Sequence, residues 1–116
     1  MSDCIFCKIV AGQIPAKKIF EDEHAIAFFD IAPAAPTHIL LIPKQHIASL
    51  ADLKPENAPL MGHLMSLVPQ LAHDQGLTNG FRTIINTGQV GGQEVYHLHI
   101  HILGGPNRLP GLVPKQ

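Results

Sequence analysis

The chain has 116 residues, and 46% of them are hydrophobic, which is enough apolar material for one domain with a buried core. The formal net charge of −1 argues against a broad electrostatic surface for nucleic acids. The sequence contains no stretch of roughly 18 apolar residues, no visible secretory signal and only two cysteines, three positions apart. We therefore expect a cytoplasmic protein without a membrane or nucleic-acid partner, in which the eight histidines call for a chemical explanation.

Short strands and one long helix are predicted along the chain. The segment from Cys4 to Val10 predicts a short helix that ends before Pro15. Pro55 to Gln75 predicts the main helix, because its apolar residues recur at three- and four-residue spacing and Gly76 can stop it. Pro69 lies inside this pattern and predicts a kink or an early break. Strands are predicted where apolar residues cluster between turn residues, over 18–22, 25–31, 38–43, 81–87 and 95–103.

The connections between neighbouring strands are mostly short, which favours antiparallel pairing. We therefore predict a single α+β domain over residues 1–116. Its sheet is expected to be an antiparallel meander of about five strands, with one main helix and a short N-terminal helix beside it.

Three histidines alternate with aliphatic residues in the last predicted strand, where Leu98 and Ile100 separate His97, His99 and His101. Because side chains on a strand alternate between its faces, the three rings should share one face while the aliphatic residues enter the core. A neutral ring has one donor and one acceptor nitrogen, so three adjacent rings are costly as mere packing. The alternative is a polar, solvated sheet face, for which Thr or Lys would be the ordinary residues.

Two other polar residues and a glycine-rich loop could serve the same site. His38 begins an aliphatic strand; alone it would be structural, but beside three histidines it could fix the tautomer of a neighbouring ring. Asp30 closes another strand, where it could cap a turn or accept hydrogen bonds from ribose hydroxyls. The loop from Gly88 to Gln93 precedes the histidines, and its glycines would let backbone amides approach a phosphate.

The pair Cys4 and Cys7 has the Cys-x-x-Cys spacing of many zinc sites. A tetrahedral site needs two more ligands, for which His46 and His97 are the candidates. The alternatives are two free cysteines on a short helix, core thiols, or a redox pair, although the redox interpretation lacks the βαβ context that it requires.

The segment from His97 to Leu103 resembles the His-x-His-x-His-x-x signature of the histidine triad family, in which x is hydrophobic. Gly104-Gly105, directly after the histidines, is similar to the nucleotide-binding branch of that family, the purine nucleoside phosphoramidases. The resemblance extends over nearly the whole chain, with further matching blocks at 5–9, 14–16, 29–31, 36–38, 42–47, 86–88 and 92–97.

This resemblance implies a homodimer whose subunits join their sheets across a shared edge. It also implies a hydrolase that binds purine nucleotides such as AMP or GMP and cleaves purine nucleoside phosphoramidates, such as adenosine 5′-monophosphoramidate. The reaction would pass through a nucleotidyl-histidine and require no cofactor. His99 matches the nucleophile, and His101 matches the residue that bonds the phosphate and the bridging atom. His38 and His97 match the orienting relay.

Further residues match the nucleotide pocket of the family. Asp30 matches the ribose-binding acid, while Glu94 stands where well-known relatives carry a Ser that contacts the leaving group. The positions that match the pocket walls are Ile5, Phe6, Ile9, Phe28, Phe29, Ile31 and Leu40, and those on the phosphate side are Asn86, Gly92 and Val95.

Some bacterial-type relatives hold a structural zinc ion, and their ligands match Cys4, Cys7, His46 and His97. Two other functions remain as alternatives. A dinucleoside polyphosphate hydrolase or nucleotidyl transferase of the same family would use the same chemistry, although Gly104-Gly105 argues against it. A nucleotide- or zinc-binding regulatory protein would hydrolyse its ligand only incidentally.

Overall fold

β2 (Ala25–Phe29) and β3 (Thr37–Pro43) form the centre of the molecule in the computed structural model, which describes residues 3–114. Both faces of these strands are covered, which explains why they are apolar almost throughout. The residues that pack with the long helix α2 (Ala58–Asp74) are Ala25, Ala27, Ile39 and Leu41. The residues that pack with the short helix α1 (Ile5–Val10) are Ile26, Phe28, Leu40 and Ile42.

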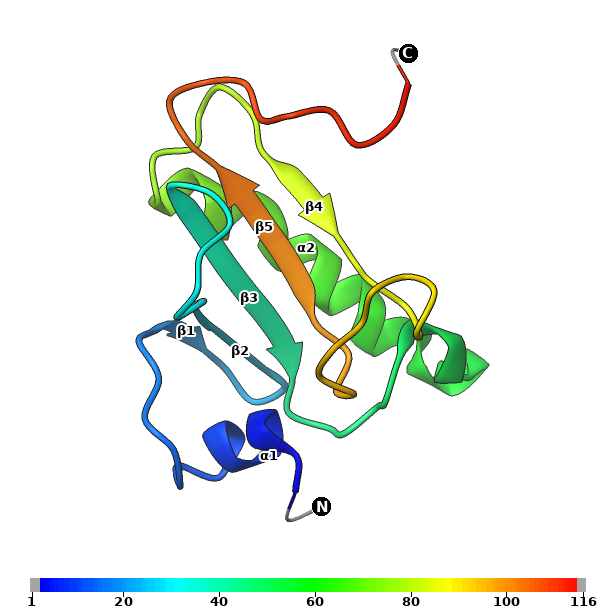
Figure 1. The fold of residues 1–116 in the computed structure, drawn as a ribbon. Helices are drawn as coiled ribbons and strands as arrows, with labels where there is room; N and C mark the ends of the chain where they lie inside the picture. Colours follow the sequence, from blue (N-terminus) through cyan, green and yellow to red (C-terminus); the bar gives the residue numbers. More distant parts are fainter. Residues whose placement is uncertain (1–2, 115–116) are drawn as a thin grey trace.

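The strands form one antiparallel sheet in the order β1-β2-β3-β5-β4 (Figure 1). β1 spans Lys18–Glu21, β4 spans Arg82–Ile84 and β5 spans Ile100–Gly104. The predicted α+β class, the five-stranded antiparallel sheet, the main helix and the short helix are confirmed. The first three strands form a meander, after which the chain passes through α2 and β5 enters between β3 and β4. β4 is therefore an edge strand.

Two short 3₁₀ turns, Leu50–Asp52 and Pro55–Asn57, precede α2. The early break predicted at Pro69 is wrong, because α2 continues through this residue. Pro69 is exposed, so the carbonyl group that loses its N–H partner one turn earlier can be hydrated. The helix stops at Gly76 as predicted, where a φ of 81° suits glycine.

β5 is shorter than the predicted strand over 95–103, since it begins at Ile100. Pro43, at the end of β3, has no backbone N–H to donate to a partner strand. Its carbonyl oxygen instead accepts a hydrogen bond from Nε2 of His97, at 2.8 Å. The ladder with β3 therefore stops at the pair Leu41 and Ile100, and His97 and His99 lie outside it. β4 is also shorter than the predicted strand over 81–87, since its pairing with β5 ends at Ile84, opposite His101.

Cys4 is the N-cap of α1, and its Sγ accepts a hydrogen bond from the N–H of Cys7, at 3.2 Å. Its buried residues Phe6 and Ile9 lie against the face of the sheet opposite α2. The helix thus holds both cysteines beside the sheet. Within residues 3–114, every helix is too short or too polar to cross a membrane.

Candidate active site and metal centre

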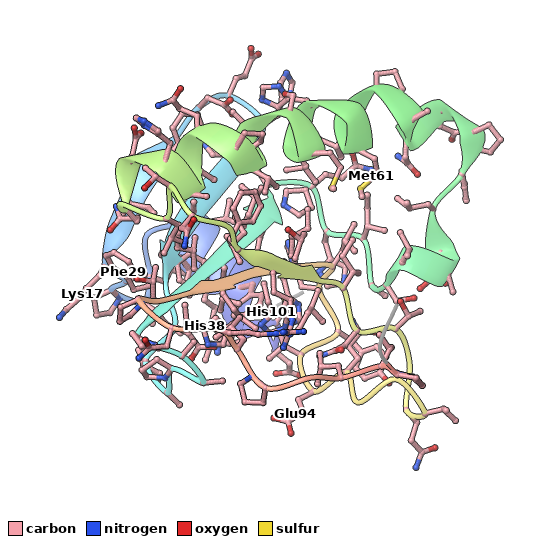
Figure 2. All side chains as sticks on the ribbon, turned by 90° about the horizontal axis from the view of Figure 1, so that it is seen from above. Lys17, Phe29, His38, Met61, Glu94 and His101 are labelled. Atoms are coloured by element: carbon pink, nitrogen blue, oxygen red, sulfur yellow. The ribbon has the colours of Figure 1, made fainter. Side chains whose placement is uncertain are left out.

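A cavity of about 530 Å³ opens on the face of the sheet that carries α1. In Figure 2, His38 and His101 lie beneath the sheet, on the face away from α2, and Glu94 lies farther from the sheet. The cavity brings together every residue predicted for the nucleotide pocket, namely Ile5, Phe6, Ile9, Phe28, Phe29, Asp30, Ile31, Leu40, Asn86, Gly92, Glu94, Val95, His99 and His101. Ile14, Pro15 and Ala16 also line it and were not predicted as pocket residues; their only signal was a matching block.

His99 is held in one tautomer by the backbone before it. Its Nδ1 lies 2.7 Å from the carbonyl oxygen of His97, which can only accept a hydrogen bond, so Nδ1 carries the proton. In the neutral ring the other nitrogen, Nε2, therefore has the lone pair. The ring is buried and contacts Phe6 edge-on, with the ring centroids 5.2 Å apart. His99 thus presents a fixed, unprotonated nitrogen in the cavity.

A chain of hydrogen bonds fixes the tautomer of His101. The N–H of Ala34 donates to Nδ1 of His38 at 3.0 Å, so the proton of His38 is on Nε2. That Nε2–H donates to Nδ1 of His101 at 2.9 Å, which leaves the proton of His101 on its own Nε2. The predicted contact of His38 with a triad ring is therefore present.

Nε2 of His101 is buried and has no hydrogen-bond partner within residues 3–114. A buried, unsatisfied N–H is costly unless a ligand completes it. Burial first, and then the neighbouring rings of His99 and His38, lower the pKa of His101 to about 4. Burial is also the main reason why the pKa of His38 is lowered. His101 is therefore neutral near pH 7 and offers a single N–H donor to the cavity.

The ring of His97 does not point into this relay. Its Nε2–H donates to the Pro43 carbonyl oxygen, and its Nδ1 faces Cys4, Cys7 and His46. The relay role predicted for His97 is thus limited to its backbone carbonyl, which holds His99. β5 begins only at Ile100, three residues after His97, so simple alternation along a strand did not apply to this ring.

Asp30 has the turn-capping role that its sequence position allowed, and it also lies at the cavity. Its Oδ1 accepts a hydrogen bond from the N–H of Ala32 at 2.8 Å and so caps the turn after β2. Its Oδ2 lies 3.5 Å from Nε2 of His38, and the residue also lines the cavity. Glu94 lines the cavity too, but its side chain is exposed. The carboxylate of Glu94 can therefore remain hydrated at the mouth.

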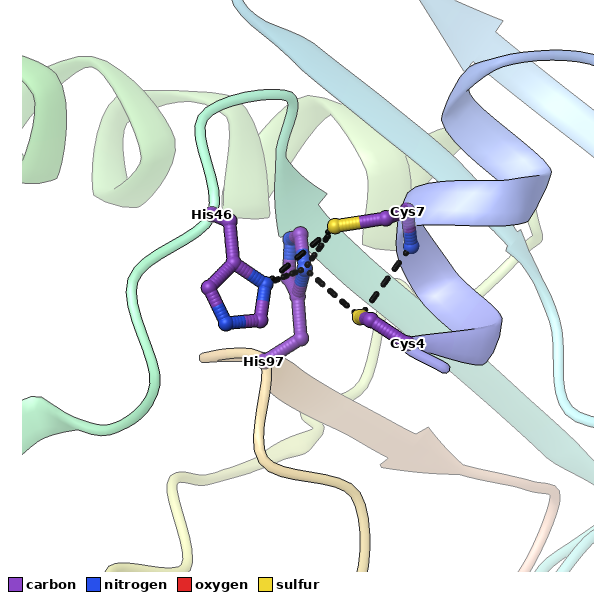
Figure 3. A group of neighbouring side chains, drawn as sticks. All are labelled: Cys4, Cys7, His46 and His97. Atoms are coloured by element: carbon purple, nitrogen blue, oxygen red, sulfur yellow. Dashed lines mark hydrogen bonds between the residues drawn. The ribbon is translucent and has the colours of Figure 1, made fainter. Parts of the chain in front are cut away.

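Cys4, Cys7, His46 and His97 converge on one point (Figure 3). Nδ1 of His46 lies 3.2 Å from Nδ1 of His97 and 3.2 Å from Sγ of Cys7. Nδ1 of His97 lies 3.4 Å from Sγ of Cys4 and 3.5 Å from Sγ of Cys7. Tetrahedral zinc requires about 3.3 Å between two nitrogen ligands and about 3.6 Å between nitrogen and sulfur. The four side chains therefore fit a tetrahedral zinc ion.

The surroundings of this cluster also suit a metal. The bond from Nε2–H of His97 to a backbone carbonyl is the usual support for a histidine ligand. Burial, the hydrogen bond with Cys4 and the charge of Cys4 raise the pKa of the Cys7 thiol. A divalent cation between the two sulfur atoms would instead favour the thiolate form of the cysteines.

Comparison with known proteins identifies the family. The family model described as "Scavenger mRNA decapping enzyme C-term binding" matches residues 3–113. Protein HitA of Neisseria gonorrhoeae is 58% identical over 106 residues, which cover 91% of this chain and 99% of HitA. The chain belongs to the histidine triad family.

Solved structures of histidine triad proteins have the same fold. A HIT family hydrolase from Legionella pneumophila is 46% identical, with a TM-score of 0.88 over 90% of this chain and 95% of that one. A histidine triad protein from Clostridium difficile is 45% identical, with a TM-score of 0.92 over 97% and 98% of the two chains. A Zn-bound histidine triad family protein from Mycobacterium smegmatis is 36% identical, with a TM-score of 0.78 over 91% and 77%.

Gln93 is a residue of this histidine triad protein that the sequence analysis missed. The buried side chain accepts a hydrogen bond from the N–H of Gly88 and donates to the carbonyl oxygens of Ala48 and Val95. The N–H of Gly92 donates to Gln89 within the same loop. The N–H groups of Gly88 and Gly92 are thus already used within the loop, which corrects the expectation that these glycines bring their amides to a phosphate. Its signals in the sequence were its place at the end of the glycine-rich loop and in the matching block 92–97.

Proposed function

We propose that the protein is a nucleotide-binding hydrolase that cleaves the P–N bond of purine nucleoside phosphoramidates, such as adenosine 5′-monophosphoramidate. One observation carries the proposal: His99, which has a lone pair on Nε2, and His101, which has an unpartnered Nε2–H, line one cavity with their ring centroids 4.9 Å apart. A nucleophile and a donor side by side suit transfer of a phosphoryl group. The related Legionella protein, described as a HIT family hydrolase, supports the reaction class.

The cavity suits a purine nucleoside monophosphate. Phe6, Ile9 and Phe28 provide an apolar wall for a base, and the rings of Phe6 and Phe28 meet edge-on with their centroids 5.7 Å apart. Asp30 would accept hydrogen bonds from the two ribose hydroxyls, as carboxylates do in other nucleotide sites. The α-phosphate would then reach His99, with Asn86, Gly92 and Val95 on its other side.

In the first half of the proposed reaction, Nε2 of His99 attacks the α-phosphorus and the bond from phosphorus to the amine nitrogen breaks. The carbonyl oxygen of His97 stabilises the positive charge that appears on the His99 ring. The Nε2–H of His101 hydrogen-bonds the phosphoryl group and the bridging nitrogen, and the leaving nitrogen takes a proton from water and departs as a neutral amine. A second water molecule then attacks the phosphorus and the bond to Nε2 of His99 breaks. The nucleoside monophosphate leaves, the proton lost by this water passes to solvent, and His99 is neutral again.

We further propose that Cys4, Cys7, His46 and His97 hold a structural zinc ion, since their ligand atoms have tetrahedral spacing. The bound ion would supply a cross-link between α1 and the two segments that carry His46 and His97. Zinc content measured on the purified protein tests this. About one zinc ion per chain is expected, and its absence after purification with zinc in all buffers would contradict the assignment.

A homodimer is the proposed assembly. β4 is an edge strand that pairs only with β5 within residues 3–114, so a partner strand could extend the sheet there. Phe81, just before this strand, is 41% exposed and would gain burial. Light scattering on a size-exclusion column should give twice the chain mass, and the mass of a single chain at micromolar concentration would exclude this assembly.

A substrate panel tests the proposed reaction. Wild type and His99→Ala are incubated separately with an adenosine 5′-phosphoramidate and with a diadenosine polyphosphate, and product release is followed. AMP binding to both proteins is measured by calorimetry. We expect the wild type to release AMP from the phosphoramidate and to leave the polyphosphate largely intact, while His99→Ala binds AMP but releases no product. Faster cleavage of the polyphosphate would instead favour the alternative hydrolase branch.

A further inference from the structure

We infer that His97 is a positioning residue through which the metal in the Cys4/Cys7/His46/His97 cluster controls the nucleophile and the nucleotide pocket. The inference rests on the proposed roles of His99 and of the zinc ligands. It goes beyond them, because it makes metal occupancy a determinant of nucleotide affinity rather than of stability alone. Two separate contact routes lead from the cluster to the cavity.

The first route runs through His97 itself. Three polar atoms of this residue have three different partners, since Nδ1 faces the cluster, Nε2 donates to Pro43 and the carbonyl oxygen accepts from His99. His97 is fully buried, so its ring cannot turn without moving its backbone. A metal bound to Nδ1 therefore fixes the carbonyl oxygen that sets the tautomer of His99, 2.7 Å away.

The second route runs through α1. Cys4 is the N-cap of this helix and Cys7 lies in its first turn, so a metal anchors the helix at that end. Phe6 lies between them in sequence and contacts the rings of both His97 and His99, at centroid distances of 6.0 and 5.2 Å. The same face of α1 supplies the cavity wall, through Ile5, Phe6 and Ile9. Loosening the cluster would loosen that wall.

Without a cation, the cluster is poorly satisfied. Nε2 of His97 carries the proton that Pro43 accepts, so Nδ1 of the neutral ring has a lone pair. This lone pair faces Nδ1 of His46 at 3.2 Å and the two sulfur atoms at 3.4 and 3.5 Å. Thiols are weak donors, so without a cation these contacts hold the four side chains only weakly. A shift of the cluster then reaches His97, and through its carbonyl oxygen His99.

Coupling between two sites is reciprocal, and wild-type protein can therefore test it directly. Zinc affinity is measured by competition with a chromophoric chelator, with and without saturating AMP. AMP affinity is measured by calorimetry on zinc-loaded and zinc-free protein. We expect each ligand to strengthen the binding of the other by about tenfold, by the same factor in both experiments. Factors below about twofold in a folded protein would overturn the inference.

Nitrogen NMR of the imidazole rings gives a second readout that needs no nucleotide. In zinc-loaded protein, His99 should show a single tautomer with the proton on Nδ1, and in zinc-free protein a mixture of tautomers. A failure of AMP to bind the zinc-loaded protein would defeat the proposed function, while the His99 spectrum would still decide the coupling. Identical His99 signals in the two forms would defeat the coupling alone.

His46 offers a matched pair of variants, because its side chain is exposed and does not line the cavity of 530 Å³. His46→Cys keeps four zinc ligands and should retain both zinc and wild-type AMP affinity. His46→Ala should lose zinc at chelator concentrations that wild type withstands, and then bind AMP as zinc-free wild type does. Normal AMP affinity in zinc-free, folded His46→Ala would contradict the inference. If zinc removal unfolds the chain, wild type loaded with cadmium is used in place of the zinc-free protein. The ¹¹³Cd signal must then shift on AMP binding, and an unmoved signal overturns the coupling.

Discussion

Each histidine of the site has a different role because its second nitrogen has a different partner. His38 accepts a hydrogen bond from the N–H of Ala34 and donates one to His101, while Nδ1–H of His99 donates to a carbonyl oxygen. Two neighbouring rings therefore present opposite atoms to the cavity, a lone pair and an N–H. A set of identical side chains becomes a nucleophile and a donor through contacts outside the cavity.

Removing His38 should therefore impair turnover without changing nucleotide binding. His38→Ala leaves Nδ1 of His101 without its donor, so His101 can shift its proton away from the cavity. We expect kcat to fall about 100-fold with AMP affinity within about threefold of wild type. His38→Asn, whose amide can donate to His101, should recover part of the loss. Equal losses in both variants, or a collapse of AMP affinity, would show that His38 only supports packing.

Glu94 should select among leaving amines. Glu94 lines the cavity, and its side chain is exposed at the mouth. We expect Glu94→Ser to raise kcat/KM for amines that bear a carboxylate by about three- to tenfold relative to neutral amines, because a like charge is removed. Glu94→Gln, which keeps the shape, should act in the same direction. The ratio is measured at low salt, and an unchanged ratio in both variants would refute the role.

The sequence predicted residues that line the cavity, but it did not predict the orientation of the His97 ring. Period-two alternation is enough to put His99 and His101 on one side, since both stand at or next to a real strand. The ring of His97 turns to the cysteines because Pro43 ends the ladder and offers a carbonyl oxygen. That choice depends on a contact between residues 54 positions apart, which no local pattern records.

At the scale of elements, the turn between β1 and β2 is tied to α2 by Asp22. Its Oδ2 accepts from Nε2 of His63 at 2.7 Å, and its Oδ1 accepts from the N–H groups of His24 and Ala25. Burial opposes ionisation of Asp22, but these hydrogen bonds outweigh it and lower the pKa of the carboxyl. The ionised form is therefore the one that stabilises the fold.

Asp22→Asn should lower the free energy of unfolding by about 1 kcal/mol near pH 7. Because the folded pKa is lowered, the contribution of the carboxylate is complete above the pKa of the unfolded chain and is lost as the pH falls through the folded value. The difference in the free energy of unfolding between wild type and Asp22→Asn, measured with urea, should thus become smaller in acid. Glu23→Gln, an exposed change in the same turn, is the control and should have little effect at either pH. A difference that stays constant with pH would contradict this role of Asp22.

The elements show where local pattern decides and where it does not. The spacing of apolar residues located α2, and Gly76 ended it, because both signals are local. The break predicted at Pro69 is wrong because the destabilisation by a proline depends on whether water can reach the carbonyl group that the proline leaves unpaired. The ends of β4 and β5 depend on their partner strands, so their own residues overestimate them.

At the scale of the whole molecule, the order of strands places the two centres side by side. Inserting β5 next to β3 brings His101 beside His38, and the segment leading into β5 brings His97 beside α1. The sequence predicted the class and the number of strands but could not tell that β5 would lie inside the sheet. Both neighbours of β5 are reached by long connections, which leave no short-range signal.

The central claim is that Nε2 of His99 attacks phosphorus, and the covalent intermediate tests it most directly. Wild type is mixed with an adenosine 5′-phosphoramidate, quenched within milliseconds and studied by intact-protein and peptide mass spectrometry. We predict a transient adduct of one adenylyl group on His99, which rises and decays at the rate of AMP release and is absent from His99→Ala. Steady AMP release with no adduct in wild type, or an adduct on another residue, would contradict the claim.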